Sequence, residues 1–122
     1  MKASEIIRQD AEQHGVDPDR VLTFIGERVE NGQASILQNG DSVLLLTKIG
    51  SGDVELHLYT LEQPMALMKS LKHFISIIER TPIRRVYGKA DNPGIIKMLE
   101  SIGVDVQESD RPEYNWMAVN RG

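Results

Sequence analysis

The sequence predicts a mixed α/β fold, in which a mainly antiparallel sheet carries helices on both faces. Apolar residues recur at helical spacing before Ala34, and strand-like patterns begin there. Residues 43–46 (VLLL) are apolar without alternation, which is typical of a central strand covered on both sides. A long amphipathic helix then separates two strands and can connect parallel neighbours. These observations predict the order ααβββαβαββ.

Two helices are predicted at the start of the chain. Residues 4–14 carry a narrow apolar face, and Gly15 follows at a position that suits a helix end. Asp17 before Pro18 provides an N-cap and a first-turn proline for a second helix, which Asn31 ends. The short link between these segments predicts a helical hairpin.

Three successive strands are predicted next. Residues 34–38 lead into Asn39-Gly40, which favours a type I′ hairpin turn because both central residues of that turn need positive φ. Residues 42–48 return as the second strand, and a glycine-containing turn leads to a third strand at residues 54–59. Apolar and polar residues alternate in the third strand, so one of its faces is polar.

The second half of the chain alternates helices and strands. The longest periodic helix covers residues 65–80, and Pro82 follows it. A short strand at residues 84–87 leads through a polar loop to a helix that Asn92 caps and Gly103 ends. Two final strands are predicted at residues 104–108 and 114–119.

Size and composition restrict the functional classes. With 122 residues, the chain is expected to form one domain, residues 1–122. Its net charge of −4 disfavours non-specific binding of nucleic acid. No apolar run reaches the ~20 residues of a membrane span, and the N-terminus lacks a signal-peptide core, so a cytoplasmic location is expected. There is no Cys, and the three His residues lack metal-ligand spacing, so no metal site is expected.

One stretch of the chain resembles a known family. Residues 84–104 form a strand that leads through Asn92 into a helix ending in Gly103 and Val104. This pattern resembles the penultimate strand and following helix of the GNAT (GCN5-related) N-acyltransferases. The predicted order fits that fold, apart from the strand that normally precedes the helical hairpin. The resemblance implies that two parallel strands splay apart and admit acyl-CoA. A ferredoxin-like fold has fewer helices and strands than this chain.

The resemblance also implies a pyrophosphate loop, Gln/Arg-x-x-Gly-x-Gly/Ala, at the start of the long helix. The corresponding residues 60–66 (TLEQPMA) contain no glycine. Glu62 adds negative charge where the pyrophosphate would lie, and Pro64 removes an N–H donor, so both oppose the binding of acetyl-CoA. If the cofactor is nevertheless bound, the residues expected to hold it are Asn92, Tyr59, Leu61 and Gln63.

The catalytic groups that the resemblance implies are incomplete. Where the family often has a tyrosine that protonates the leaving thiolate, this chain has Leu99, which has no proton to give. Tyr87 is an alternative donor, although a structural tyrosine is the simpler interpretation. In an active enzyme, Glu55 or His57 would serve as the general base; the alternative is that both lie on a solvated face or an interface.

The main aromatic candidates for a protein contact lie near the C-terminus. Trp116 falls in the last predicted strand, and Tyr114 is close to it in sequence. Both are interface candidates, because aromatic side chains often anchor protein interfaces. The alternative for Trp116 is a core position that closes the sheet.

Two functional hypotheses follow. The first is a non-catalytic GNAT-like protein that needs no cofactor and works through protein contacts in a homo- or hetero-oligomeric assembly. The C-terminal pattern, which includes Asn92, Leu99, Gly103 and Glu108, resembles the small GNAT-like virion proteins of short-tailed bacteriophages, which implies a virion location. The second hypothesis is an acetyl-CoA-dependent N-acetyltransferase with a divergent pyrophosphate loop.

Overall fold

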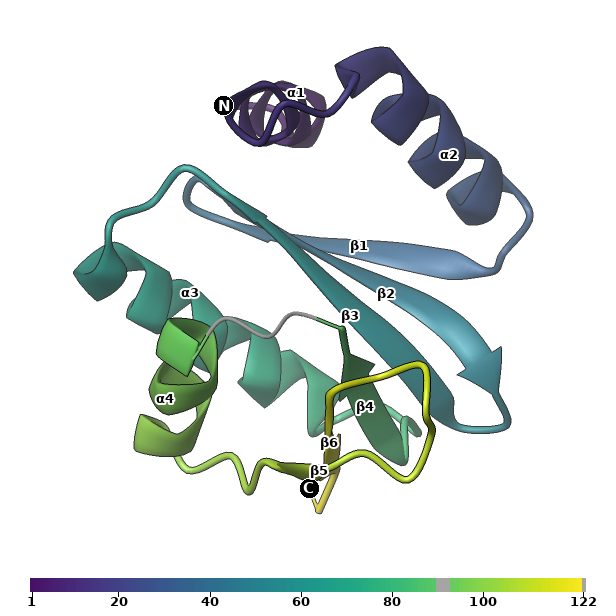
Figure 1. The fold of residues 1–122 in the computed structure, drawn as a ribbon, viewed down its shortest axis with the longest axis vertical. Coiled ribbons are helices and arrows are strands. Elements are labelled where there is room, and N and C mark those ends of the chain that lie inside the picture. Colours follow the sequence, from purple (N-terminus) through teal and green to yellow (C-terminus); the bar gives the residue numbers. More distant parts are fainter. Residues whose placement is uncertain (90–92, 122) are drawn as a thin grey trace.

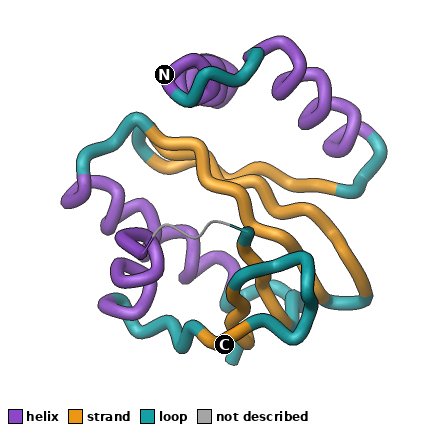
Figure 2. Tube along the Cα trace, in the orientation of Figure 1, coloured by secondary structure: helices purple, strands orange, loops and turns teal. Residues whose placement is uncertain are grey.

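Helices cover both faces of a single sheet in this protein (Figures 1 and 2). The structure is a computed structural model that describes residues 1–89 and 93–121. The helices in these ranges are α1 (Ala3–Gln13), α2 (Pro18–Glu30), α3 (Pro64–Ile78) and α4 (Pro93–Ser101). The strands are β1 (Ala34–Asn39), β2 (Ser42–Gly50), β3 (Asp53–Thr60), β4 (Arg85–Gly88), β5 (Gln107–Glu108) and β6 (Trp116–Val119). Their order confirms the prediction.

The sheet is mainly antiparallel, as expected. Its strands lie in the order β1-β2-β3-β4-β6-β5. Neighbouring strands are antiparallel except for β3 and β4, which are parallel. Helix α3 connects these two strands, because parallel neighbours need a crossover between them. The predicted crossover is therefore confirmed.

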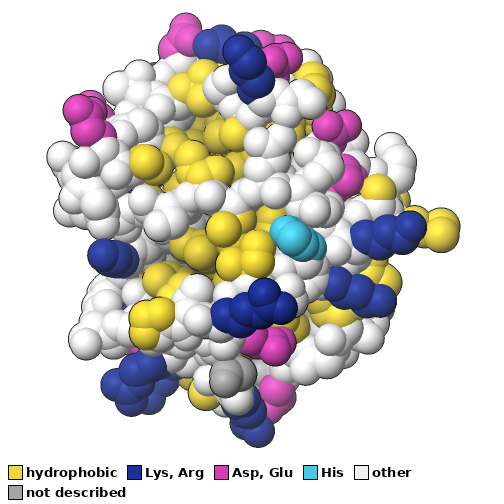
Figure 3. All heavy atoms as spheres, turned by 180° about the vertical axis from the view of Figure 1, so that it is seen from behind, with side chains coloured by type: hydrophobic (Ala, Val, Ile, Leu, Met, Phe, Trp, Pro, Cys, Tyr) yellow, Lys and Arg dark blue, Asp and Glu magenta, His cyan; other side chains and the backbone are white. Residues whose placement is uncertain are grey.

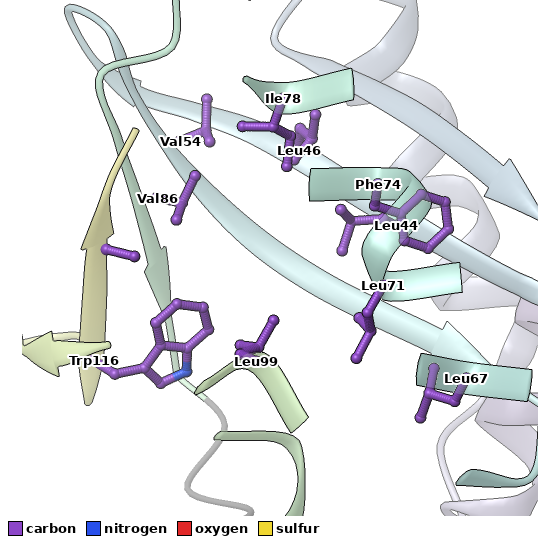
Figure 4. Packing of buried hydrophobic residues seen from close by; sticks show 11 residues of the cluster. Leu44, Leu46, Val54, Leu67, Leu71, Phe74, Ile78, Val86, Leu99 and Trp116 are labelled. Carbon is purple, nitrogen blue, oxygen red and sulfur yellow. The ribbon is translucent and has the colours of Figure 1, made fainter. Parts of the chain in front are cut away.

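Strand β2 contributes to both sides of the core. Val43 and Leu45 join the side chains of α1 and α2 on one face. Leu44 and Leu46 join those of α3 and α4 on the other face, where Figure 4 shows them beside the side chains of α3. Because successive side chains of a strand alternate between faces, the unbroken apolar run gives each helical layer its own contacts. This confirms the prediction of a central strand.

The first hairpin differs from the prediction in its turn. Asn39 pairs with Ser42, so the two-residue loop consists of Gly40 and Asp41 and not of Asn39 and Gly40. Gly40 has φ 55°, and no described non-glycine residue has positive φ. A type I′ turn needs positive φ at both central residues, so the predicted turn type is wrong. The pairing of β1 with β2 extends through Asn39 and moves the turn by one residue.

The predicted helix ends at Asp17 and Gly103 are confirmed, whereas the predicted lengths of the last two strands are wrong. The Asp17 side chain accepts a hydrogen bond from the Asp19 N–H at the start of α2. After α4, Gly103 has φ 95° and the Val104 N–H donates to the Leu99 carbonyl, which closes the helix. Val104 is thus part of the helix end, and β5 begins only at Gln107. None of the described helices is long and apolar enough to span a bilayer.

Candidate functional site

Strands β3 and β4 separate partway along their length. Their parallel pairing ends at Glu55 and Tyr87. Strand β4 stops at Gly88, whereas β3 continues to Thr60 and pairs there with β2. We call the region beyond these last partners, where β3 and β4 are no longer paired, the fork. Helix α3 begins at Pro64, shortly after β3, so its N-terminus lies beside the fork.

A polar face of β3 borders the fork on the side of α1 and α2. Glu55, His57 and Tyr59 alternate with apolar residues and share this face, as the sequence predicts. The ring centroids of His57 and Tyr59 are 4.5 Å apart. The Nζ atom of Lys89, which follows β4, lies 3.8 Å from Glu55 Oε1. The two candidate bases therefore share one face of β3, and Lys89 lies beside one of them, Glu55.

The environment of His57 favours its neutral form. His57 is exposed, as expected of a solvated face, yet the protein around its ring desolvates the imidazole enough to lower the pKa of His57 below its usual 6.5. The nearby carboxylates of Asp10 and Glu55 oppose this shift without reversing its direction. Desolvation and the same two carboxylates raise the pKa of Tyr59 to about 12. At neutral pH His57 can therefore accept a proton, and Tyr59 keeps its own.

Tyr87 is fixed as part of the protein core. Its side chain is 0% exposed, and its hydroxyl donates to Asp110 Oδ1 at 2.8 Å. The guanidinium of Arg111 lies over the Tyr87 ring at 5.1 Å and donates to Asp53 Oδ2 at 2.8 Å. The hydroxyl is thus committed to an internal partner, which supports a structural role for Tyr87 and not that of an acid.

The loop between β3 and α3 is held by internal hydrogen bonds. The Thr60 N–H donates to Asp10 Oδ2 at 2.9 Å, and the Leu61 N–H donates to the Asp41 carbonyl at 3.1 Å. Gln63 occupies the N-cap position of α3, but its side chain makes no capping hydrogen bond. The first amides of α3 therefore receive no acceptor from the N-cap side chain.

The Glu62 carboxylate is turned inward, and the expectation that its charge opposes phosphate binding stays a prediction. Its Oε1 accepts hydrogen bonds from the hydroxyls of Ser42 and Ser70, the latter at 2.6 Å. Its Oε2 lies so close to Gly40 that a Cβ at that glycine would overlap it. The negative charge therefore points toward the β1–β2 turn and away from the outer surface of the loop.

Ser70 is a member of this polar cluster that was not predicted from the sequence. Ser70 is 0% exposed, and its hydroxyl also accepts a hydrogen bond from Asn39 Nδ2 at 3.0 Å. One signal was present, because Ser70 lies between Leu67 and Leu71 on the apolar stripe of α3. A polar residue on such a stripe needs an internal partner.

The remaining candidate site residues lie in the core, at the surface or outside the described residues. Leu99 is buried, with 4% of its surface exposed, and its apolar side chain cannot act as an acid. Trp116 is 5% exposed and packs in the core, which corrects its expected role as an interface anchor, because Gly88 leaves room for the indole. Tyr114 is partly exposed between Tyr87 and Lys89, and its contact role stays a prediction. Asn92 lies outside the described residues.

The described residues offer no metal centre as an alternative to the fork, and a pocket at the other end of α3 is separate from it. This pocket of about 350 Å³ lies at the C-terminal end of α3, lined by residues that include Ile75, Val86 and Val104. In the part of the chain that the structure describes, no three His, Asp or Glu side chains gather into a potential metal site. The fork and its polar face are therefore the candidate site.

Solved structures resemble the chain over nearly its whole length. A chimera of the Vibrio cholerae spermidine N-acetyltransferase SpeG and hSSAT matches with a TM-score of 0.60 and 7% identity, over 98% of this chain and 90% of that one. The Campylobacter jejuni N-acetyltransferase PseH, solved with acetyl coenzyme A, matches with a TM-score of 0.58 and 12% identity, over 100% and 94%. The chain has the GNAT fold.

The likeness extends to a third acetyltransferase, again at low sequence identity. The ribosomal-protein-S5-alanine acetyltransferase of Vibrio fischeri matches with a TM-score of 0.52 and 9% identity, over 98% of this chain and 87% of that one. No protein-family model and no curated sequence matches the chain. Identities this low support the GNAT fold alone, since one fold can host several functions.

Proposed function

We propose that this protein is an acyl-CoA-dependent N-acyltransferase that acts on an amine. The observation that carries the proposal is the fork between β3 and β4, which has the start of α3 at one end and the neutral His57 on its polar face. Acetyl-CoA, when bound, would supply the acyl group as a thioester. The acetyltransferases that share the fold support this assignment.

The loop before α3 is suited to holding the phosphates despite its lack of glycine. The N-terminus of a helix attracts anions through its unpaired amides and its dipole. Gln63 does not cap these amides, and Glu62 directs its charge inward. Main-chain groups of Tyr59 and Gln63 would hold the cofactor, and Asn92 is a further candidate. The Leu61 N–H donates to the Asp41 carbonyl, so the expected contribution of Leu61 is limited to its carbonyl oxygen.

The polar face of β3 provides the base. An alkylamine is protonated at neutral pH and must lose a proton before its nitrogen can attack. His57 accepts that proton, because desolvation keeps its pKa below 6.5. Glu55 is the second candidate base, and its carboxylate also attracts the cationic amine to the fork. Because Leu99 donates no proton, turnover is expected to be about 10²–10⁴-fold slower than with a positioned acid.

Titration with acetyl-CoA tests the proposal. With a Kd of about 10 μM, 1 mM ligand should raise the free energy of unfolding by roughly 2.7 kcal/mol, seen as a higher melting temperature. Release of free thiol in the presence of amines then tests turnover. A melting temperature that does not respond to acetyl-CoA would remove the enzyme from consideration.

Two substitutions at Gln63 isolate the phosphate site. Gln63→Asn and Gln63→Asp both provide a good N-cap, and only the aspartate adds negative charge. Gln63→Asp is expected to weaken acetyl-CoA binding about tenfold relative to Gln63→Asn, because like charges near a protein surface repel by about 1–3 kcal/mol. Equal affinities in calorimetry would mean that the phosphates do not lie at the start of α3.

The edge of the sheet supports a second candidate function. Strand β1 pairs with β2 alone, lacks charged residues and proline, and leaves Ile36 37% exposed. Edge strands usually carry charged residues or proline, which oppose pairing with strands of other chains. Figure 3 shows hydrophobic side chains gathered in the middle of the rear face, with Lys and Arg beside them. These features favour a protein that works through protein contacts. The second candidate is therefore a non-catalytic assembly role, for which a bacteriophage virion component stays a proposal.

Sedimentation distinguishes the two candidates. An assembly protein should associate at micromolar concentration, and Ile36→Lys should reduce that association because charge on an edge strand opposes pairing. A monomer that responds to acetyl-CoA supports the enzyme. An oligomer without any response to acetyl-CoA supports the assembly role.

A further inference from the structure

The indole N–H of Trp116 is a buried hydrogen-bond donor without an acceptor. Trp116 is 5% exposed, and across residues 1–89 and 93–121 its Nε1 is the buried side-chain atom that lacks a partner. Buried polar groups are nearly always paired, because an unpaired one has lost its hydrogen bonds to water without replacement. The orphaned donor therefore indicates an acceptor that the described chain does not supply.

The orphaned N–H lies at the closed end of the fork. Trp116 pairs with Gly88, the last residue of β4, and a Cβ on Gly88 would overlap Nε1 and the adjoining ring carbons. The nitrogen therefore lies directly over Gly88, one residue beyond Tyr87, where the pairing of β3 with β4 stops. Figure 4 shows the nitrogen on the side of the indole nearer to Leu99 of α4.

The donor and the candidate base lie on opposite faces of the sheet. Trp116 belongs to the core cluster on the side of α3 and α4. His57 shares a face with Tyr59, which packs with α1 and α2. A carbonyl group held in the fork can therefore receive a hydrogen bond from one face while an amine approaches its carbon from the other.

We propose that the Trp116 indole N–H binds the acyl carbonyl oxygen of the thioester. This inference rests on the proposed acyl-CoA-dependent function. An indole nitrogen is a donor only, so it selects an acceptor oxygen and cannot bind the cationic amine. The oxygen would enter beside the end of β4, where Gly88 lies next to the nitrogen.

The length of β3 identifies which part of the ligand reaches the donor. From Glu55 to Thr60 the strand extends for roughly 15–17 Å, since each residue adds about 3.3 Å. Phosphates at the start of α3 would lie at the open end of this span. The part of the ligand farthest from the phosphates, which is the acyl thioester, therefore reaches the closed end over Gly88.

The single tryptophan makes the test direct. Because the chain has one Trp, its indole N–H gives one assignable signal in a ¹H–¹⁵N spectrum of the intact protein. Acetyl-CoA is expected to move this signal downfield, as a new hydrogen bond does. CoA, which has the same phosphates and amides but no acyl carbonyl, is expected to leave it nearly unchanged. Equal shifts with both ligands, or no shift with either, would overturn the proposal.

The variant Trp116→Phe provides a second readout. It removes the N–H and keeps an aromatic ring in the core, so the protein is expected to stay folded. Its affinity for acetyl-CoA should fall about fivefold, the value of one ordinary hydrogen bond, while its affinity for CoA is unchanged. Equal losses for both ligands would mean a purely structural role for the indole.

The two proposals fail in different ways. If acetyl-CoA raises the melting temperature of the wild-type protein but the indole signal does not move, the role of Trp116 is wrong and the acyltransferase proposal stands. If acetyl-CoA neither raises the melting temperature nor moves the signal, both proposals are wrong. Both proposals are supported if only acetyl-CoA moves the indole signal and if Trp116→Phe loses affinity for acetyl-CoA but not for CoA.

Discussion

Replacing Ser70 with alanine is expected to lower the free energy of unfolding by about 2–3.5 kcal/mol. Ser70 is 0% exposed, and its hydroxyl donates to Glu62 Oε1 at 2.6 Å and accepts from Asn39 Nδ2 at 3.0 Å. A hydrogen bond to a charged group contributes ~1.5–3 kcal/mol, and the lost partner of Asn39 adds ~1 kcal/mol. The higher helix propensity of alanine offsets ~0.5 kcal/mol of this loss. The melting temperature should fall by roughly 10 °C.

The same substitution at Ser76 is the matched control. Ser76 lies on α3 as well, but its hydroxyl is exposed and bonds only to the His73 carbonyl of its own helix. Ser76→Ala should therefore change stability by less than ~0.5 kcal/mol. Urea unfolding followed by circular dichroism measures both variants.

A double-mutant cycle assigns the loss to one bond. If Ser70 acts through Glu62, then Ser70→Ala should cost at least ~1 kcal/mol less in the background of Glu62→Gln than in the wild-type protein. Indistinguishable effects of Ser70→Ala and Ser76→Ala would refute the reasoning. The hydrogen bond from Ser70 to Glu62 would then not stabilise the inward orientation of the Glu62 carboxylate.

Three further predictions concern residues around the fork. Gly88→Ala should cost about 2–3 kcal/mol, because the new Cβ overlaps the rigid Trp116 indole, and adding Trp116→Leu should relieve part of that loss in urea titrations. Desolvation lowers the pKa of His57 in the folded protein. As the pH falls, the imidazole is therefore protonated at a higher pH in the unfolded chain than in the folded protein. The stabilisation that neutral His57 provides is complete above about pH 6.5 and declines below it. The melting temperature of His57→Gln should therefore fall less than that of the wild-type protein when the pH is lowered. Tyr87→Phe removes the 2.8 Å bond to Asp110 and should cost about 1 kcal/mol in the same urea assay; an unchanged midpoint would mean that this bond is not stabilising.

Elements defined by local chemistry were predictable from the sequence. The cap at Asp17 and the helix end at Gly103 depend on residues a few positions away, and both are as expected. The apolar run of residues 43–46 indicated a strand buried on both faces without reference to any other segment. The turn after β1 was misplaced by one residue, because its position depends on the register of two strands and not on the Asn39-Gly40 dipeptide alone.

The candidate site depended on contacts between distant segments, which only the tertiary structure decided. The sequence marked the polar residues Glu55 and His57 and the loop around Gln63, and it predicted that two parallel strands meet. It could not show that Glu62 turns inward, because the hydroxyls that bind its carboxylate come from β2 and α3. The indole of Trp116 likewise lies over Gly88 only after β6 pairs with β4. Local propensity acts over a few residues, whereas burial and hydrogen-bond partners are determined by the packing of the whole sheet and its helices.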